Sequence, residues 1–138
     1  MKTRLTLLAA ALWWGSLTAM GFIAVPLLFA HLPTPAMAGN MAAQLFHAQS
    51  WVSVVCAMVL LVYAQKDREA KAGQPQAAIA LIVAGLLCAL LGEYAVAPRI
   101  VARENLRLWH SVGSALYLLQ WLCAAAVLWR AGRKPEAP

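Results

Sequence analysis

The sequence predicts an all-α fold: a four-helix bundle that spans a membrane and forms one domain over residues 1–138. Two observations favour this fold class. The chain is 63% hydrophobic and only 12% charged, whereas charged residues make up roughly 25% of a soluble domain. It also contains four apolar stretches, each long enough to supply the ~20 helical residues that cross a hydrocarbon core. A backbone in lipid must satisfy its own hydrogen bonds, so these stretches are expected to be helices.

The four expected spans are, in chain order, Leu5–Leu32, Ala42–Ala64, Ala77–Ala97 and Leu108–Trp129. The first begins like a signal peptide, because Lys2 and Arg4 precede a run rich in Leu and Ala, and residues 36–38 resemble a cleavage site. We expect the segment to be retained, since its apolar run is about twice as long as a typical signal core. Pro26 should kink this helix, because a proline cannot donate the hydrogen bond that a helix interior requires.

Short connections separate the spans. Pro33–Asn40 is uncharged and rich in turn-forming residues, so it is expected to be a loop that reverses the chain. Lys66–Pro75 is charged and ends in helix breakers, as is typical of a solvated connection. The third connection contains Pro98, and the sequence leaves open whether this proline ends or bends the third helix.

The distribution of Lys and Arg predicts the orientation in the membrane. Two precede the first span, none lies in the first connection, three lie in each of the next two connections, and three follow the last span. With both termini cytoplasmic, eight cations are inside and three outside, as the positive-inside rule favours. We therefore expect a multi-pass protein of the inner, cytoplasmic membrane. The formal charge of +6 is accounted for by these topology signals and indicates no nucleic-acid partner.

Small and polar residues indicate which helix faces pack together, because close approach and hydrogen bonds drive helix association in lipid. The third span carries Gly85, Cys88, Ala89 and Gly92, and the fourth carries Gly113, Ser114, Tyr117, Gln120 and Trp121. Cys56, Cys88 and Cys123 stand alone in three different spans, so we expect them to be small packing residues. Tryptophans near span ends, Trp13 and Trp14 among them, are expected at the headgroup level.

The candidate site consists of all three histidines, His31, His47 and His110, and the only acid within an apolar stretch, Glu93. The predicted topology places them near the outer ends of the spans. Three histidines and a carboxylate could bind a transition metal, ligate haem or relay protons. The alternative is structural: Glu93 could pair with Arg99 or accept a hydrogen bond from a histidine, and all four could reach interfacial water.

In the binding hypothesis, His47 and His110 ligate a metal or haem, and His31 is a further metal ligand. Glu93 completes or orients the ligand shell, and Arg99 neutralises an anionic group of the cofactor. Two other functions stay open: a non-catalytic membrane partner that interacts with lipid, and a small transporter subunit in which Glu93 and a histidine relay protons. Transport would need an oligomer. No nucleophile elbow, phosphate-binding glycine loop or HExxH helix is present, so the sequence gives no support for a hydrolase or kinase, and a protein without enzyme activity is the favoured alternative.

Arg99, Arg103 and Arg107 recur at four-residue spacing. If residues 98–107 are helical, the three form one basic face on the outer side. Such a face opposes the positive-inside preference and predicts an anionic partner, with lipid headgroups as the favoured candidate.

Several short motifs resemble a known family. They are residues 13–18, 25–29, 32–33, 38–40, 45–46, 93–94, 97–99 and 109–110, followed by Gly113. Their order and spacing resemble the four-helix membrane proteins of the transmembrane protein 205-like type, a family whose domain is of unknown function. A more distant similarity is to copper-resistance D-type proteins and to four-helix protoporphyrinogen oxidases, and the latter similarity implies haem. The chain departs from the oxidase pattern, since it has no His between Leu5 and Ala30 and no Lys or Arg between Ala77 and Ala97.

Overall fold

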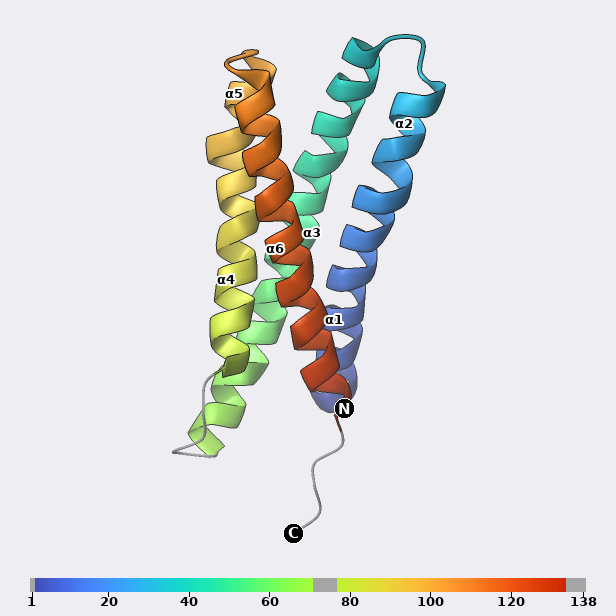
Figure 1. Cartoon of the computed structure of the whole chain (residues 1–138). Coiled ribbons are helices and arrows are strands. Elements are labelled where there is room, and N and C mark those ends of the chain that lie inside the picture. Colours follow the sequence, from blue (N-terminus) through green and yellow to red (C-terminus); the bar gives the residue numbers. More distant parts are fainter. Residues whose placement is uncertain (1, 71–76, 134–138) are drawn as a thin grey trace.

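Four membrane-length helical rods make up the computed structural model, which describes residues 2–70 and 77–133 (Figure 1). All regular secondary structure within these residues is helical. The segments long and apolar enough to cross a membrane are Arg4–His31, Pro35–Lys66, Ala77–Val101 and Leu106–Gly132. The predicted all-helical, multi-pass membrane protein is confirmed at this level of length and composition.

Two of the rods are continuous helices, α3 (Pro35–Ala70) and α6 (Leu106–Gly132). The other two each contain a π-helical segment. One runs from α1 (Lys2–Ala19) through η1 (Met20–Ala24) to α2 (Val25–His31), and the other from α4 (Ala77–Leu91) through η2 (Gly92–Val96) to α5 (Ala97–Val101). Contacts of α1 with α3 and α6, and of α4 with the same two helices, arrange the rods as a ring.

Both π-helical segments lie directly before a proline. The N–H groups of Val25 and Ala97, which precede Pro26 and Pro98, donate to the carbonyls of Met20 and Gly92, five residues back. Each proline has no N–H to continue the α-helical pattern. At Pro26, where a kink was expected, the structure has a π-helical segment just before the proline, and such segments are common sites of helix bending. Pro98 does not end the third span, which continues as α5 to Val101.

The first turn is much shorter than the predicted loop Pro33–Asn40, and that prediction is wrong beyond Thr34. Only residues 32–34 form the turn, and α3 already begins at Pro35. Proline suits the first position of a helix. The side-chain oxygen of Thr34 accepts a hydrogen bond from the N–H of Met37 at 3.2 Å and so caps the helix. In the second connection, α3 continues to Ala70, and the rest of the predicted loop lies outside the described residues.

The turn between α5 and α6 separates the three arginines that were predicted to share a face. Arg99 lies on α5, Arg103 lies in the turn with φ 56°, and Arg107 lies on α6. The N–H of Glu104 donates to the carbonyl of Arg99, and the N–H of Arg103 donates to that of Ile100, both at 3.0 Å. This pair of bonds is the Schellman arrangement that ends a helix. The predicted basic face is therefore wrong.

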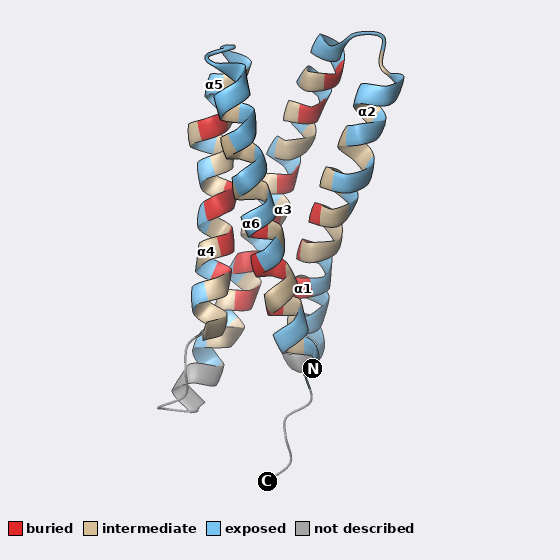
Figure 2. Cartoon of the chain, in the orientation of Figure 1, coloured by how far each residue is buried: buried red, intermediate tan, exposed pale blue. Residues whose placement is uncertain are grey.

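Buried apolar residues gather in the half of the bundle that holds the start of α1 and the end of α6 (Figure 2). Trp13 is fully buried in this core and faces neighbouring helices. Its ring lies over Gly85: a Cβ at Gly85 would be 2.8 Å from the ring. All three cysteines are free and buried, in agreement with their expected role as packing residues. The opposite end of the bundle, with the turns at residues 32–34 and 102–105, is called the two-turn end below.

Candidate functional site

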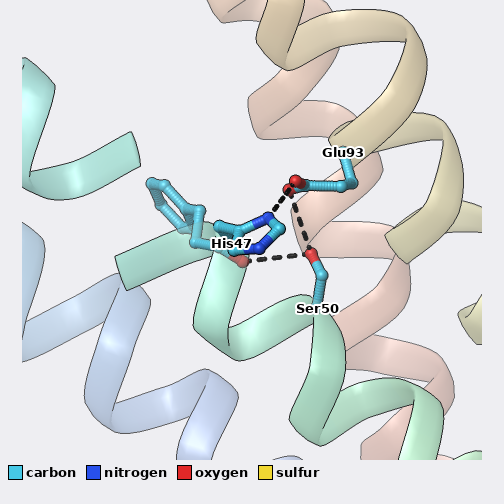
Figure 3. Close-up of polar contacts among 4 residues, drawn as sticks. His47, Ser50 and Glu93 are labelled. Atoms are coloured by element: carbon cyan, nitrogen blue, oxygen red, sulfur yellow. Dashed lines mark hydrogen bonds and ion pairs between the residues drawn. The ribbon is translucent and has the colours of Figure 1, made fainter. Parts of the chain in front are cut away.

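An imidazole–carboxylate pair connects α3 to η2 in the two-turn half of the bundle. Nδ1 of His47 and Oε1 of Glu93 are 2.5 Å apart (Figure 3). The His47 side chain is 58% exposed, whereas that of Glu93 is only 15% exposed. Ser50 lies one turn farther along α3, and its hydroxyl is 3.0 Å from the Phe46 carbonyl and 3.4 Å from Oε2 of Glu93. The structure thus brings two of the predicted site residues together around a nearly buried carboxylate.

Glu93 points inward because it continues the buried face of α4. Ile82, Gly85 and Ala89 are buried on that face, and Glu93 follows Ala89 at the four-residue spacing of a helix face. A carboxylate within a membrane span is costly and usually faces the bundle interior beside a partner. His47 and Ser50 are the partners here.

A cavity of about 430 Å³ lies between the rods beside this pair. Its polar wall residues on α3 are Gln49, Ser50 and Ser53, and those on α6 are His110, Ser114, Tyr117 and Gln120. Apolar side chains supply much of the rest, including Phe22, Val25, Val96, Ile100 and Leu116. Glu93 and Gly92 belong to the wall, and His47 does not. The polar stripe expected on the fourth span therefore faces a cavity as well as neighbouring helices.

A buried hydrogen-bond network lies deeper in the same cavity. Gln49 donates to the hydroxyl of Ser16, and Gln120 donates to that of Ser53, both at 2.9 Å. Gln49, Ser53 and Gln120 are the buried polar residues of the described chain. The sequence predicts a packing face that includes Gln120, but Gln49 and Ser53 do not stand out in it. The sequence pattern that could have identified them is a helical spacing of three to four residues. It runs from Phe46 through Gln49 and Ser50 to Ser53.

The remaining predicted site residues do not join the pair. His31 is exposed, and its Nδ1 is 3.0 Å from the carbonyl of Leu27 in its own helix. His110 is exposed and lines the cavity. The Arg99 guanidinium lies 4.4 Å from the centre of the Trp109 ring and donates to the carbonyl of Ala95. Glu93 therefore pairs with His47 and not with Arg99.

The predicted metal set is not assembled in the described part of the chain. No group of three or more His, Cys, Asp and Glu side chains comes together there, whereas a transition-metal site in a protein ordinarily uses three or four such ligands. The two proposed haem ligands also differ in position, since His110 lines the cavity and His47 does not. Haem or metal binding by His31, His47, Glu93 and His110, with Arg99, stays a prediction of the sequence.

The comparisons with known proteins identify a family without a known activity. Residues 8–108 match the model of a domain of unknown function, DUF4149. No curated protein and no solved structure matches the chain.

Proposed function

Since this chain belongs to the DUF4149 family, whose domain has no known function, we propose its activity from its geometry: it is a membrane-embedded binding protein for a mainly apolar small molecule. The observation that carries the proposal is the cavity of about 430 Å³ with Glu93 in its wall. Small-molecule sites are typically cavities of about 300–1,000 Å³ with apolar walls and a few polar groups. Ionisable groups within a membrane span mark functional sites by default. Glu93 and Ser50 belong to the polar part of the proposed site, and His47 pairs with Glu93 from outside the cavity wall.

The apolar core supports binding over transport. Beyond Ser53 and Gln120, in the direction of the chain termini, the bundle is filled by a buried cluster that includes Trp13, Ala57 and Val127. Apart from the thiol of Cys56, the buried residues of this cluster contribute no ionisable side chain, and none of them is the carboxylic acid or histidine expected of a proton relay. The cavity of a single copy therefore ends within the bundle, as expected of a binding site.

The outer surface of the rods supports residence in lipid. Many large apolar side chains are exposed on it, among them Leu8, Val55 and Trp129. From the distribution of cations we propose the inner membrane and cytoplasmic termini, which reporter fusions at each end would test. From the resemblance of its motifs, we also propose that the chain is related to the transmembrane protein 205-like proteins.

Cys88 provides a reporter for entry into the cavity, because it lines the cavity and Cys56 and Cys123 do not. We expect N-ethylmaleimide, a small neutral reagent that dissolves in lipid, to alkylate Cys88 in proteoliposomes several times faster than the other two cysteines. Peptide mass spectrometry would measure the rate at each cysteine separately.

Gly92→Leu provides the blocking variant. Gly92 lines the cavity, and a Cβ at this position meets nothing within 4 Å, so a side chain can be added there without a clash at Cβ. Gly15→Leu is the matched control, because Gly15 is equally open at Cβ but lies away from the cavity. Gly92→Leu should slow alkylation of Cys88 and Gly15→Leu should not. Equal rates at all three cysteines, unchanged in Gly92→Leu, would remove the support for an accessible cavity.

A further inference from the structure

The hydrogen-bonding capacity left in the cavity indicates the class of ligand. Resting on the proposed binding function, we infer that the cavity takes a lipophilic primary amine, whose ammonium group donates to Glu93. Three observations carry this inference: the hydroxyls of Ser16 and Ser53 have already donated their hydrogens, the amide oxygens of Gln49 and Gln120 are unpaired, and the one acidic group of the wall is Glu93.

The serine hydroxyls fix the direction of the buried network. Ser53 donates its hydroxyl hydrogen to the carbonyl of Gln49, and Ser16 donates to the carbonyl of Trp13, both at 3.0 Å. With its single hydrogen used, each hydroxyl oxygen can only accept a further bond. The partner amides must therefore present their Nε2 groups, as Gln120 does to Ser53 and Gln49 to Ser16.

Each of the two amides therefore keeps its oxygen as a free acceptor, together with one unused N–H. The Oε1 atoms of Gln49 and Gln120 take part in no hydrogen bond within the described part of the chain. Tyr117 adds no free donor, because its hydroxyl donates to the carbonyl of Leu17 at 2.7 Å. The other groups of the wall that can donate, His110 and Ser114, lie nearer the two-turn end of α6.

Glu93 adds the charged acceptor. Its Oε1 accepts from His47, but Oε2 has only the Ser50 hydroxyl at 3.4 Å, and that hydroxyl is closer to the carbonyl of Phe46. Oε2 therefore has room for a stronger donor. No Lys or Arg lines the cavity among the described residues, since the Arg99 guanidinium lies over Trp109. A carboxylate in an apolar cavity is best matched by a cation that also donates hydrogen bonds.

An ammonium group on an alkyl chain meets these requirements. It offers three N–H donors for Oε2 and neighbouring acceptors, and its chain can lie against the apolar wall of Phe22, Val25 and Leu116. Phe46 and Tyr117, whose rings pack edge to face with centroids 5.4 Å apart, lie in the same wall. Aromatic faces attract cations and so add to the preference for a positive charge.

Protection of Cys88 from N-ethylmaleimide tests this inference with four ligands of equal chain length: dodecylamine, dodecyltrimethylammonium, dodecanol and dodecanoate. Proteoliposomes of fixed composition are used, and ligand amounts are expressed as mole fractions in the lipid. We expect dodecylamine to half-protect Cys88 at a mole fraction about ten-fold lower than the other three, the effect of one good charge-assisted hydrogen bond. Dodecyltrimethylammonium has the positive charge but no N–H. Comparison with dodecylamine therefore separates the contribution of the charge from that of the hydrogen bond.

In Glu93→Gln, the mole fractions at which dodecylamine and the other ligands half-protect Cys88 should differ by no more than about two-fold. Gln44→Leu is the control, because Gln44 is exposed on α3 and lies outside the cavity. This variant should keep the preference for the amine. Equal protection by all four ligands would overturn the inference and leave the binding function in place. Protection by none of them, with Cys88 still reactive, would instead count against the binding function. A preference for dodecylamine that persists in Glu93→Gln would show that the carboxylate does not select the ligand.

Discussion

Glu93 is the residue that most needs an explanation, since its carboxylate lies within a membrane span and is only 15% exposed. His47 and Ser50 provide hydrogen-bonding partners that reduce the cost of burying it. The pair is asymmetric, because the imidazole is largely exposed and the carboxylate is not. Loss of the His47 side chain should therefore destabilise the protein mainly because the Glu93 carboxylate stays buried without its imidazole partner.

A double-mutant cycle measures the strength of this pair. His47→Ala, Glu93→Ala and the double variant should give a coupling free energy of about 1 kcal/mol, which lies within the range found for side-chain hydrogen bonds in membrane proteins. Unfolding in mixed micelles with increasing dodecyl sulfate provides the free energies. Strictly additive effects would show that the contact does not stabilise the fold.

The sequence predicted, as one alternative, that Glu93 accepts a hydrogen bond from a histidine, and the structure shows this contact with His47. It did not predict the buried hydrogen-bond network of Gln49, Ser53 and Gln120. Ionisable residues in apolar stretches stand out by type, so His47 and Glu93 were found as candidates. Gln49 and Ser53 are common residues, and their importance depends on the rotation of α3 that turns them toward Ser16 and Gln120. Helix rotation is set by packing between rods, which hydropathy does not encode.

At the scale of elements, proline and turn chemistry decide the shape of the rods. η1 and η2 each precede a proline and each contribute residues to the cavity wall. Apolar length predicted the four spans, but the ends of helices depend on caps. The Thr34 side chain caps α3, which therefore begins at Pro35, before the expected start of the span. The Schellman hydrogen bonds donated by Arg103 and Glu104 end α5.

Arg103→Gly tests the turn after α5. Arg103 adopts φ 56°, a left-handed conformation that costs an ordinary residue about 1 kcal/mol and a glycine little. The variant should therefore raise the free energy of unfolding by up to about 1 kcal/mol. Ala102→Gly is the control, because Ala102 has an ordinary φ of −71° and should gain nothing. If both variants have the same effect, the strain at Arg103 is not relieved by glycine.

Gly85→Ala tests the close contact between α4 and α1. The added methyl would lie 2.8 Å from the Trp13 ring and 3.2 Å from Cβ of Cys123, in a core where Trp13 is fully buried. Overpacking of this kind costs about 1–3 kcal/mol. Thermal unfolding in mild detergent should show a lower melting temperature for Gly85→Ala, whereas Gly15→Ala, with open space at Cβ, should be neutral or slightly stabilising. A wild-type melting temperature for Gly85→Ala would show that Trp13 can move aside.

On the scale of the whole molecule, the bundle has two halves with different roles. The half near the chain termini contains the closely packed apolar core around Trp13, and the rods diverge from it toward the two-turn end, where the cavity lies (Figure 1). Hydropathy predicted the rods and their number. It could not predict the cavity, which lies where the side chains of all four rods leave space between them.

The measurement that tests the central claim most directly is equilibrium binding of tritiated dodecylamine to the protein in lipid nanodiscs. Empty nanodiscs correct for partition into lipid, and Gly15→Leu is the matched control for Gly92→Leu. The account predicts saturable binding of one molecule per chain to the wild type and to Gly15→Leu, and at least a ten-fold loss of affinity in Gly92→Leu, on the order of 1.4 kcal/mol. Binding that never saturates, or that is as strong in Gly92→Leu as in the wild type, would contradict it.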